Sequence, residues 1–424
     1  MKYSLLLLVL LVFAGCTKYP PYIPHDYTCD YGGCDTSKLE VVWQKPFTKD
    51  STACGSEKAI FHKNGVLFKD NCGDGTGQKF NFFDGKTGNL IWNWKGYLAA
   101  VPSNADVDAI KFNNNFFFTN SKETYSVSLE SGKTIWSGIT LNSSPFLSVQ
   151  NNYVYNIRSE NLPTLLENSH LLRTRVDKLS WDTVYTQKPI DRFVPRIENP
   201  SVWISPQGDE IAIFQSRFYD FTNSKGRIDV VAYNVTQKIE YFRFENIDPY
   251  QTGSVNFPYI VGDKAFIPLD YTVLCIDLPN KKILWSKNFL YGQSFLAFQP
   301  FIMVNNKLYI KPDDFTMYAV NPDTGDELWK DSDSGAAGKG EMIYYNGVIY
   351  FTCSGNGKLY ALEEATGKKL WAEPSPNYFK AKYNNFKKFD GANIGESGIA
   401  IDTVNNLLYT SDYYFMMCLK LPKK

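Results

Sequence analysis

The sequence predicts an all-β protein, built as one eight-bladed β-propeller of four-stranded antiparallel blades. Three observations lead to this prediction. Aromatic residues make up 16% of the 424 residues, and aromatic rings pack well on pleated strands. A turn-and-tryptophan pattern recurs with a period near that of a four-stranded blade. Short turns rich in Asn and Gly alternate with apolar strand segments from residue 39 onward.

The repeat joins an aliphatic strand, a turn with Asp or Asn followed by Thr-Gly, and a strand that carries Trp. Its clearest copies cover residues 83–92, 318–329 and 360–371, and weaker copies end at Trp136, Trp181, Tyr241 and Trp285. From Trp92 the successive spacings are 44, 45, 60, 44, 44 and 42 residues. These two strands are predicted to be the outer strands, C and D, of each blade. Because the copy around Tyr241 is degraded, seven blades is the alternative.

An inner hairpin, of strands A and B, also recurs eight times. Its predicted turns are Asn64-Gly65, Asn114-Asn115, Asn151-Asn152, Gln207-Gly208, Gly262-Asp263, Asn305-Asn306, Asn346-Gly347 and Asn405-Asn406. The last inner hairpin is followed by a C strand at residues 415–419 but by no D strand, whereas residues 40–46 form a D strand without a C strand. We therefore expect the N-terminal strand to complete the last blade, which removes two open sheet edges.

The tryptophans of the repeat are predicted to pack blade against blade and not to contact a ligand. They are Trp43, Trp92, Trp136, Trp181, Trp285, Trp329 and Trp371.

The N-terminus predicts export and lipid anchoring. Lys2 precedes a short apolar run, and Phe13-Ala14-Gly15-Cys16 resembles the lipobox of bacterial lipoproteins. The predicted organisation is a signal peptide at 1–15, a lipidated, Pro-containing tether at 16–38 and the propeller at 39–424. An ordinary secretory signal cut nearby is the alternative to lipidation of Cys16.

The remaining seven cysteines would lie in an oxidising compartment, where disulfides persist. Cys29 and Cys34 bracket a flexible turn, and Cys54 and Cys72 flank a predicted hairpin, so these two pairs are the disulfide candidates. Cys275, Cys353 and Cys418 lie in apolar strand patterns and are predicted to be small buried residues.

Between residues 39 and 421 the repeat resembles the pyrroloquinoline-quinone (PQQ) type repeat. One branch of that family holds quinone- and calcium-dependent alcohol dehydrogenases; another holds non-enzymatic propellers, including the propeller lipoprotein of the outer-membrane β-barrel assembly machinery. The lipobox and the lack of further domains resemble the second branch. The adjacent cysteines of the quinone site and a Cys-x-x-Cys-His haem motif do not occur in the sequence.

We accordingly expect no catalytic site, metal or cofactor, and a monomeric scaffold that binds envelope proteins, lipid-anchored at the outer membrane facing the periplasm. A quinone-dependent dehydrogenase and an extracytoplasmic glycan-binding protein are the alternatives. Lys plus Arg and Asp plus Glu both total 44, and this balance argues against nucleic-acid binding.

Long segments at 187–202, 217–227 and 373–397 are predicted loops that gather on one face. The last contains five aromatics and four lysines between residues 377 and 389, a composition that favours a protein interface. Its partner-binding candidates are Tyr378, Phe379, Lys380, Lys382, Tyr383, Phe386, Lys387 and Lys388. The alternative is that these rings fold back and plug the channel.

Overall fold

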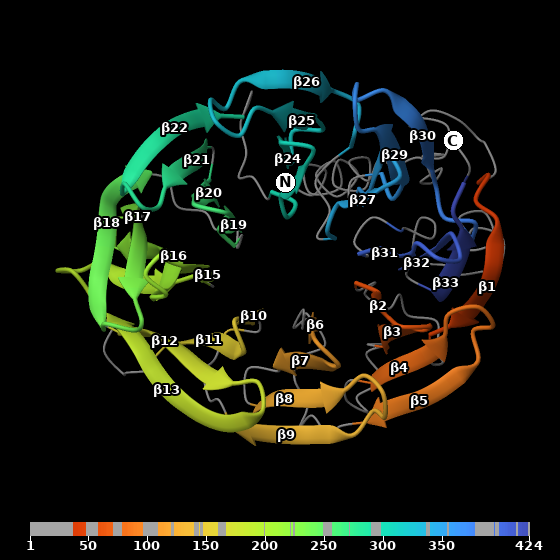
Figure 1. Ribbon diagram of the computed structural model, residues 1–424, viewed down its shortest axis with the longest axis horizontal. Helices are drawn as coiled ribbons and strands as arrows, with labels where there is room; N and C mark the ends of the chain where they lie inside the picture. The colour runs from red at the N-terminus through yellow and green to blue at the C-terminus, as the bar shows by residue number, and fades with distance from the viewer. Residues whose placement is uncertain are drawn as a thin grey trace, which may run out of the picture. The chain divides into compact units, whose positions relative to one another are not determined.

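Eight antiparallel sheets follow one another along the chain, and each forms one blade of a propeller (Figure 1). This computed structural model describes residues 37–47, 58–70, 79–95, 109–119, 123–139, 144, 147–159, 167–198, 200–220, 222–223, 225–248, 257–270, 272–289, 298–335, 340–353, 356–377, 394, 398–412 and 414–422. Contacts divide the chain into residues 1–36 and a unit that runs from Ser37 to Lys424. Within the described residues, no helix is long and apolar enough to cross a membrane.

The first three blades follow the A–B–C–D order of the repeat. Blade 1 contains β2 (Ile60–His62), β3 (Gly65–Asp70), β4 (Lys79–Asp84) and β5 (Leu90–Lys95). Blade 2 contains β6 (Ile110–Phe112), β7 (Asn115–Thr119), β8 (Glu123–Ser128) and β9 (Thr134–Ile139). Blade 3 contains β10 (Ser148–Gln150), β11 (Tyr153–Ser159), β12 (Ser169–Arg175) and β13 (Lys178–Gln187).

Blades 5 to 7 repeat that order. Blade 5 contains β19 (Tyr259–Val261), β20 (Lys264–Pro268), β21 (Thr272–Asp277) and β22 (Lys282–Asn288). Blade 6 contains β23 (Ile302–Val304), β24 (Lys307–Ile310), β25 (Met317–Val320) and β26 (Glu327–Asp331). Blade 7 contains β27 (Ile343–Tyr345), β28 (Val348–Thr352), β29 (Leu359–Glu363) and β30 (Lys369–Glu373).

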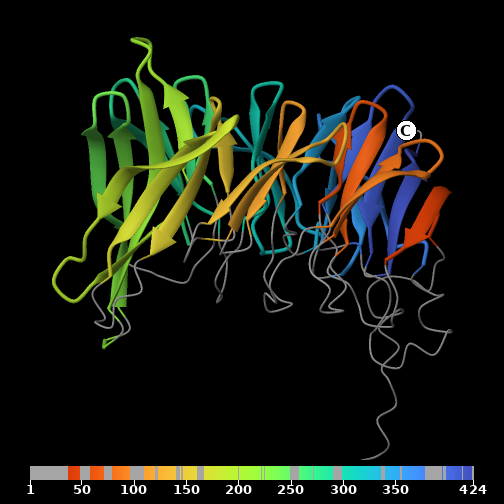
Figure 2. The same ribbon diagram turned by 90° about the horizontal axis from the view of Figure 1, so that it is seen from below.

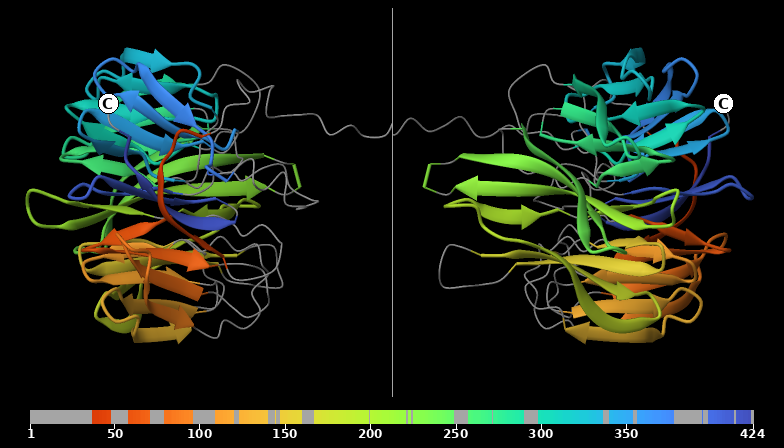
Figure 3. Two further views of the ribbon diagram at one scale, coloured as in Figure 1. Left: turned by 90° about the vertical axis from the view of Figure 1, so that its right-hand side faces the viewer. Right: turned by 60° about the vertical axis from the view of Figure 1, so that its left-hand side comes forward.

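Blade 8 closes the ring with strands from both ends of the chain. It contains β31 (Ala400–Asp402), β32 (Leu407–Ser411), β33 (Phe415–Lys420) and the N-terminal β1 (Val41–Pro46). β1 pairs antiparallel with β33, so that Trp43 lies opposite Cys418. Figure 3 shows β1 in red beside the blue strands of this blade. The eight-bladed fold and its closure by the N-terminal strand are confirmed, and the seven-bladed alternative is wrong.

Blade 4 is longer than the others and contains an additional strand. Its strands are β14 (Val194–Ile197), β15 (Ser201–Ile204), β16 (Glu210–Asp220), β17 (Lys225–Asn234) and β18 (Ile239–Asp248). β14 and β15 pair with successive halves of β16, so the inner strand of this blade is broken in two. This insertion explains the 60-residue spacing in the repeat. In Figure 3 the green strands of blade 4 extend beyond the neighbouring blades.

Blade 4 also corrects two of the predicted loops. Residues 194–197 of the first loop form β14, and most of the segment 217–227 belongs to the hairpin of β16 and β17. The polar residues Gln215, Arg217 and Asp229 lie in this stretch or within two residues of it. All three are buried: Gln215 and Arg217 bond to Pro268 and Asp270 of blade 5, and Asp229 accepts a hydrogen bond from Arg243 of its own blade.

The turns of the inner hairpins lie at one edge of the ring, as Figure 2 shows for the described strands. Two of them begin one residue earlier than predicted, at Lys63-Asn64 and Asn113-Asn114, with positive φ at Lys63 and Asn113. Gly65 is already part of β3, and a Cβ there would meet the Phe82 ring at 2.4 Å. The glycine is therefore required for close packing between strands, not for the turn.

Candidate functional site

Most of the residues predicted to carry function lie outside the described part of the chain. These are Cys16, Cys29, Cys34, Cys54, Cys72 and residues 378–388. Lipidation, both disulfide pairs and the partner-binding segment therefore stay predictions. Cys275, Cys353 and Cys418 are described, and each is fully buried within a strand or at its end.

Within the described residues, five of the seven repeat tryptophans form a hydrogen bond to the following blade. The indole N–H of Trp43 donates to the carbonyl of Gly85 at 2.7 Å, and that of Trp329 donates to the carbonyl of Glu364 at 3.1 Å. The same bond joins Trp92, Trp136 and Trp285 to Leu129, Val176 and Pro322. Each acceptor lies in the C–D turn of the following blade. In these five tryptophans the indole N–H, the polar group of the side chain, is therefore used in a contact between blades.

The glycine of the repeat completes this contact. Gly88, Gly132, Gly325 and Gly367 have φ between +66° and +74°. A Cβ on any of them would lie within 2.8 Å of an indole of the preceding blade. The Thr-Gly turn is thus needed both for the left-handed backbone and for the approach of the ring.

The degraded copies differ in this contact. In blade 4, Phe242 occupies the register position of the tryptophan, opposite Ala232, whereas the sequence repeat had pointed to Tyr241. Trp181 of blade 3 lies at a second irregularity of its strand, and its indole nitrogen has no hydrogen-bond partner within the described residues.

Charge concentrates between blades 4 and 5, at the end of β16. Arg217 lies 3.1 Å from Asp270 of blade 5 and 3.6 Å from Glu198, and all three side chains are at most 9% exposed. Arg217 also donates to Gln215 at 3.2 Å, and Gln215 donates to the carbonyl of Pro268 at 2.6 Å. Burial raises the pKa of the Glu198 carboxyl, against the opposing effect of the two nearby arginines. Below, "the blade 4/5 network" means Glu198, Arg217 and Asp270.

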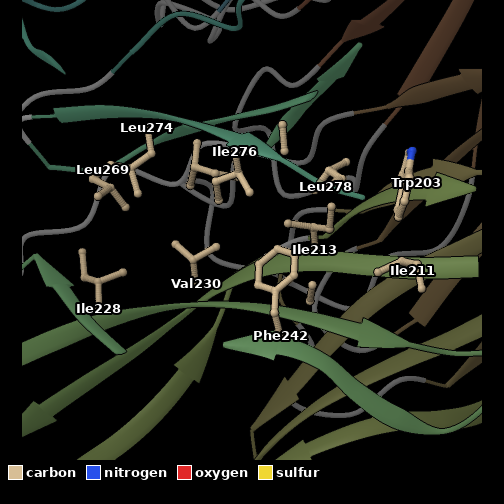
Figure 4. Packing of buried hydrophobic residues seen from close by; sticks show 13 residues of the cluster. Trp203, Ile211, Ile213, Ile228, Val230, Phe242, Leu269, Leu274, Ile276 and Leu278 are labelled. Carbon is tan, nitrogen blue, oxygen red and sulfur yellow. The ribbon is translucent and has the colours of Figure 1, made fainter. Parts of the chain in front are cut away.

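This network is built on an aliphatic core. Ile213, Val230 and Phe242 of blade 4 pack against Ile276 and other aliphatic residues of blade 5 (Figure 4). The apolar layer fills the body of the interface, and the charged residues lie beside the end of β16. There Arg196 of β14 is the residue opposite Arg217 in the antiparallel register. The additional strand β14 therefore brings a further arginine to the network.

A second charged cluster joins blade 4 to blade 3. Asp229 is fully buried and accepts hydrogen bonds from Arg243 at 2.9 Å and Arg227 at 3.3 Å. Arg243 also donates to the Tyr185 hydroxyl at 2.7 Å and to Gln187 at 3.2 Å. Blade 4 is thus joined to blade 5 by a buried ion pair and to blade 3 by the hydrogen bonds of Arg243.

Two arginines at the end of blade 4 lie mainly in solvent. Arg192 contacts the buried Asp220 at 2.5 Å, and Arg196 contacts the buried Glu198 at 3.3 Å. The arginine side chains are 61% and 62% exposed. Anchored cations of this kind suit recognition of an acidic protein surface. We call Arg192 and Arg196 "the arginine rim". Sequence reasoning missed it because the segment was interpreted as loop.

The segment with the predicted partner-binding residues begins at a buried polar cluster. Asp412 of blade 8 accepts hydrogen bonds from Ser375 at 2.6 Å and from Asn377 at 3.1 Å. It also accepts the backbone N–H groups of Tyr414 and Phe415. Burial raises the pKa of the Asp412 carboxyl. These bonds fix the chain up to Asn377, directly before the segment.

The quinone-dependent dehydrogenases named above bind a calcium ion, for which acidic side chains are typical ligands. No group of three His, Cys, Asp or Glu side chains in this part of the chain is arranged to hold a metal ion. The acids of blade 4 are instead paired with arginine, which would compete with a cation. The sequence also has no pair of adjacent cysteines.

Comparison with known families supports the interpretation of the repeat. A family model described as outer membrane protein assembly factor BamB matches residues 229–402, which extend from blade 4 into blade 8. A comparison with curated protein sequences found no match.

Solved structures share the fold at low sequence identity. BamB from Moraxella catarrhalis is 12% identical with a TM-score of 0.56, over 91% of this chain and 98% of that one. A europium-containing methanol dehydrogenase is 10% identical with a TM-score of 0.57, over 88% and 84%. Sqt1 from Saccharomyces cerevisiae is 8% identical with a TM-score of 0.61, over 92% and 100%. The predicted PQQ-type repeat propeller is therefore confirmed.

Proposed function

We propose that this chain is a non-catalytic, lipid-anchored propeller that binds other proteins of the bacterial envelope and contributes to outer-membrane protein assembly. The observation that carries the proposal is the match of residues 229–402 to the model of an outer-membrane assembly factor. The lipobox at Cys16 and the Pro-containing tether agree with it, because both suit a protein held at a membrane surface.

Two features are candidates for the contact with a partner. One is the aromatic and lysine-rich segment at 378–388, whose composition suits an interface. The other is the arginine rim. Its cations are anchored on buried acids, so little side-chain entropy is lost when an acidic partner binds. Both candidates are basic, and we expect the partner to present carboxylates.

The direct test is affinity capture of the tagged, lipidated chain from detergent-solubilised envelope membranes. We expect outer-membrane assembly proteins among the proteins that mass spectrometry finds enriched over an untagged control. A capture that enriches no envelope protein would overturn the proposal.

A quadruple variant separates the two roles open to the segment: Tyr378→Ser, Phe379→Ser, Tyr383→Ser and Phe386→Ser. If the rings are an interface, capture falls while the free energy of unfolding hardly changes. If they plug the channel, stability falls by several kcal/mol, roughly as for other buried rings. If neither quantity changes, the segment has neither role.

The anchor has its own test. Cys16→Ser should release the chain into the soluble fraction or leave the signal uncut, because the acyl acceptor is gone. Membrane retention of a correctly cleaved Cys16→Ser chain would show that the anchor lies elsewhere.

A quinone-dependent dehydrogenase is the second candidate, because 88% of the chain aligns with the structure of a methanol dehydrogenase. Pyrroloquinoline quinone with calcium separates the two. A ligand at a hundred times its dissociation constant stabilises a fold by about 2.7 kcal/mol, a clear shift in melting temperature. We expect no shift and no alcohol oxidation; either one would favour the enzyme.

A further inference from the structure

The outer strand of most blades contains a β-bulge at the residue directly before the tryptophan. In blade 1, Phe82 lies opposite Trp92 but Phe83 lies opposite Leu90, so Ile91 has no partner in the register. In five other blades, too, the aliphatic residue directly before the tryptophan has no partner in the register and forms the bulge. These residues are Val42, Ile135, Leu284, Leu328 and Leu370.

The bulge turns the aliphatic side chain outward while the tryptophan turns toward the next blade. Ile91, Ile135 and Val42 are 49%, 48% and 44% exposed. The preference for Leu or Ile before Trp in this repeat is therefore not explained by burial. Blades 8, 1, 2, 5 and 6 each present such an exposed apolar side chain on the outer wall of the ring, whereas Leu370 of blade 7 packs against the core.

Blades 8, 1 and 2 differ from blades 5 and 6 in what accompanies these residues. The outer strands of these three blades, β1, β5 and β9, together contain two charged residues, Lys45 and Lys95. They add exposed apolar residues, Leu90 at 51% and Ile139 at 68%. By contrast, the outer strands of blades 5 and 6 carry five charges. These are Lys282, Lys287, Glu327, Lys330 and Asp331.

The outer strands of blades 8, 1 and 2 are neighbours, because the tryptophans of one strand bond to the following blade. Trp94 of β5 donates to the Thr134 hydroxyl of β9 at 2.9 Å, next to Ile135. Trp43 of β1 bonds to Gly85 in the turn that leads into β5. We call Val42, Leu90, Ile91, Ile135 and Ile139 "the apolar wall".

A second strand is a poor occupant for this surface. An outer strand can pair with another chain only through a regular row of backbone groups, and a bulge interrupts that row. The bulges at Val42, Ile91 and Ile135 interrupt it on all three blades. What remains is a surface contact made by side chains, with no directional hydrogen bonding.

We propose that the apolar wall rests on the phospholipid bilayer to which the chain is anchored. This inference depends on the lipid anchor of the proposed function. Residues 17–36 separate Cys16 from the folded unit, a tether of at most roughly 70 Å when fully extended. The tether leads into β1, which itself carries Val42 of the wall. Exposed aliphatic residues with few charges suit the boundary between headgroups and acyl chains.

Carbene labelling from within the membrane tests this contact on the full-length, lipidated protein. The lipidated chain is reconstituted into vesicles of phosphatidylethanolamine and phosphatidylglycerol that contain a phospholipid with a diazirine on its acyl chain. After photolysis, mass spectrometry locates the labelled peptides. We expect labelling of β5 and β9 several-fold above that of β22 and β26.

Two matched double variants test whether the labelling depends on the residues of the apolar wall. Ile135→Asn with Ile139→Asn should lower labelling of β5 and β9, whereas Leu284→Asn with Leu328→Asn should leave it unchanged. All four residues are exposed, so neither pair is expected to unfold the chain, and circular dichroism verifies this. Even labelling around the ring, or labelling of the N-terminal peptide alone, would overturn the inference. Absence of the lipid mass on Cys16 would instead refute the anchor.

Discussion

The interface between blades 1 and 2 and the interface between blades 4 and 5 solve the same packing problem with different chemistry. Between blades 1 and 2, aromatic rings fill the space, with Phe80 4.7 Å and Trp94 5.0 Å from Phe118 between ring centroids. Between blades 4 and 5, the body of the interface is mainly aliphatic and its end holds the blade 4/5 network.

The comparison distinguishes the interactions that are sufficient to join two blades from the buried charges that are found in addition in blade 4. Aromatic packing and the tryptophan bond suffice to join two blades in a register that all regular copies share. Buried ion pairs are costly to desolvate and contribute little net stability. Their concentration in the one blade with an additional strand is therefore better explained by a function of that blade than by stability.

Both interfaces depend on closure of the ring, and opening it should have the largest effect. Deletion of residues 39–46 removes β1 and exposes the edge of β33. We expect aggregation or loss of cooperative unfolding, measured by light scattering and thermal denaturation. A monomer with an unchanged melting temperature would refute closure by the N-terminal strand.

Arg217→Met breaks the blade 4/5 network while keeping much of the side-chain volume. It leaves the buried carboxylates of Glu198 and Asp270 without their shared cation, which should cost about 3–5 kcal/mol in urea denaturation. The matched change between blades 1 and 2 is Phe118→Ala, with a similar cost of about 3–5 kcal/mol from the cavity.

The two variants should differ in their response to pH. The cost of Arg217→Met arises from charge and should shrink when the acids are protonated, whereas the cost of Phe118→Ala should not. Equal costs for the two variants at every pH would mean that the blade 4/5 network carries no charge in the folded protein.

Glu198→Gln gives a smaller and more specific effect. Because burial raises the pKa of Glu198 in the folded state, the folded protein binds this proton more tightly than the unfolded chain. Stability contributed by the protonated form is fully present below the ordinary pKa of Glu and is lost as pH rises through the raised pKa. Relative to Glu198→Gln, the wild-type chain should therefore lose stability with rising pH in that window. A difference in the opposite direction would refute the raised pKa.

The regular blades could be predicted from the sequence, whereas for blade 4 only the turn at Gln207-Gly208 and the approximate place of the outer hairpin could. The Thr-Gly turn and the following Trp mark each regular outer hairpin, because both take part in the same contact. In blade 4, Phe242 replaces the tryptophan and buried residues such as Arg217 and Asp229 interrupt the apolar pattern. A buried ion pair between distant residues leaves no local signal, so the network and the arginine rim required the structure.

The measurement that tests the account most directly is capture by variants of the arginine rim. Tagged wild-type chain is compared with Arg192→Ser plus Arg196→Ser, and with Lys282→Ser plus Lys330→Ser on the regular blades 5 and 6. We predict that the wild-type and lysine variants enrich outer-membrane assembly proteins equally, and that the arginine variant loses most of this capture at a temperature at which circular dichroism shows that it is still folded. Equal capture by all three chains would contradict the assignment of partner binding to blade 4.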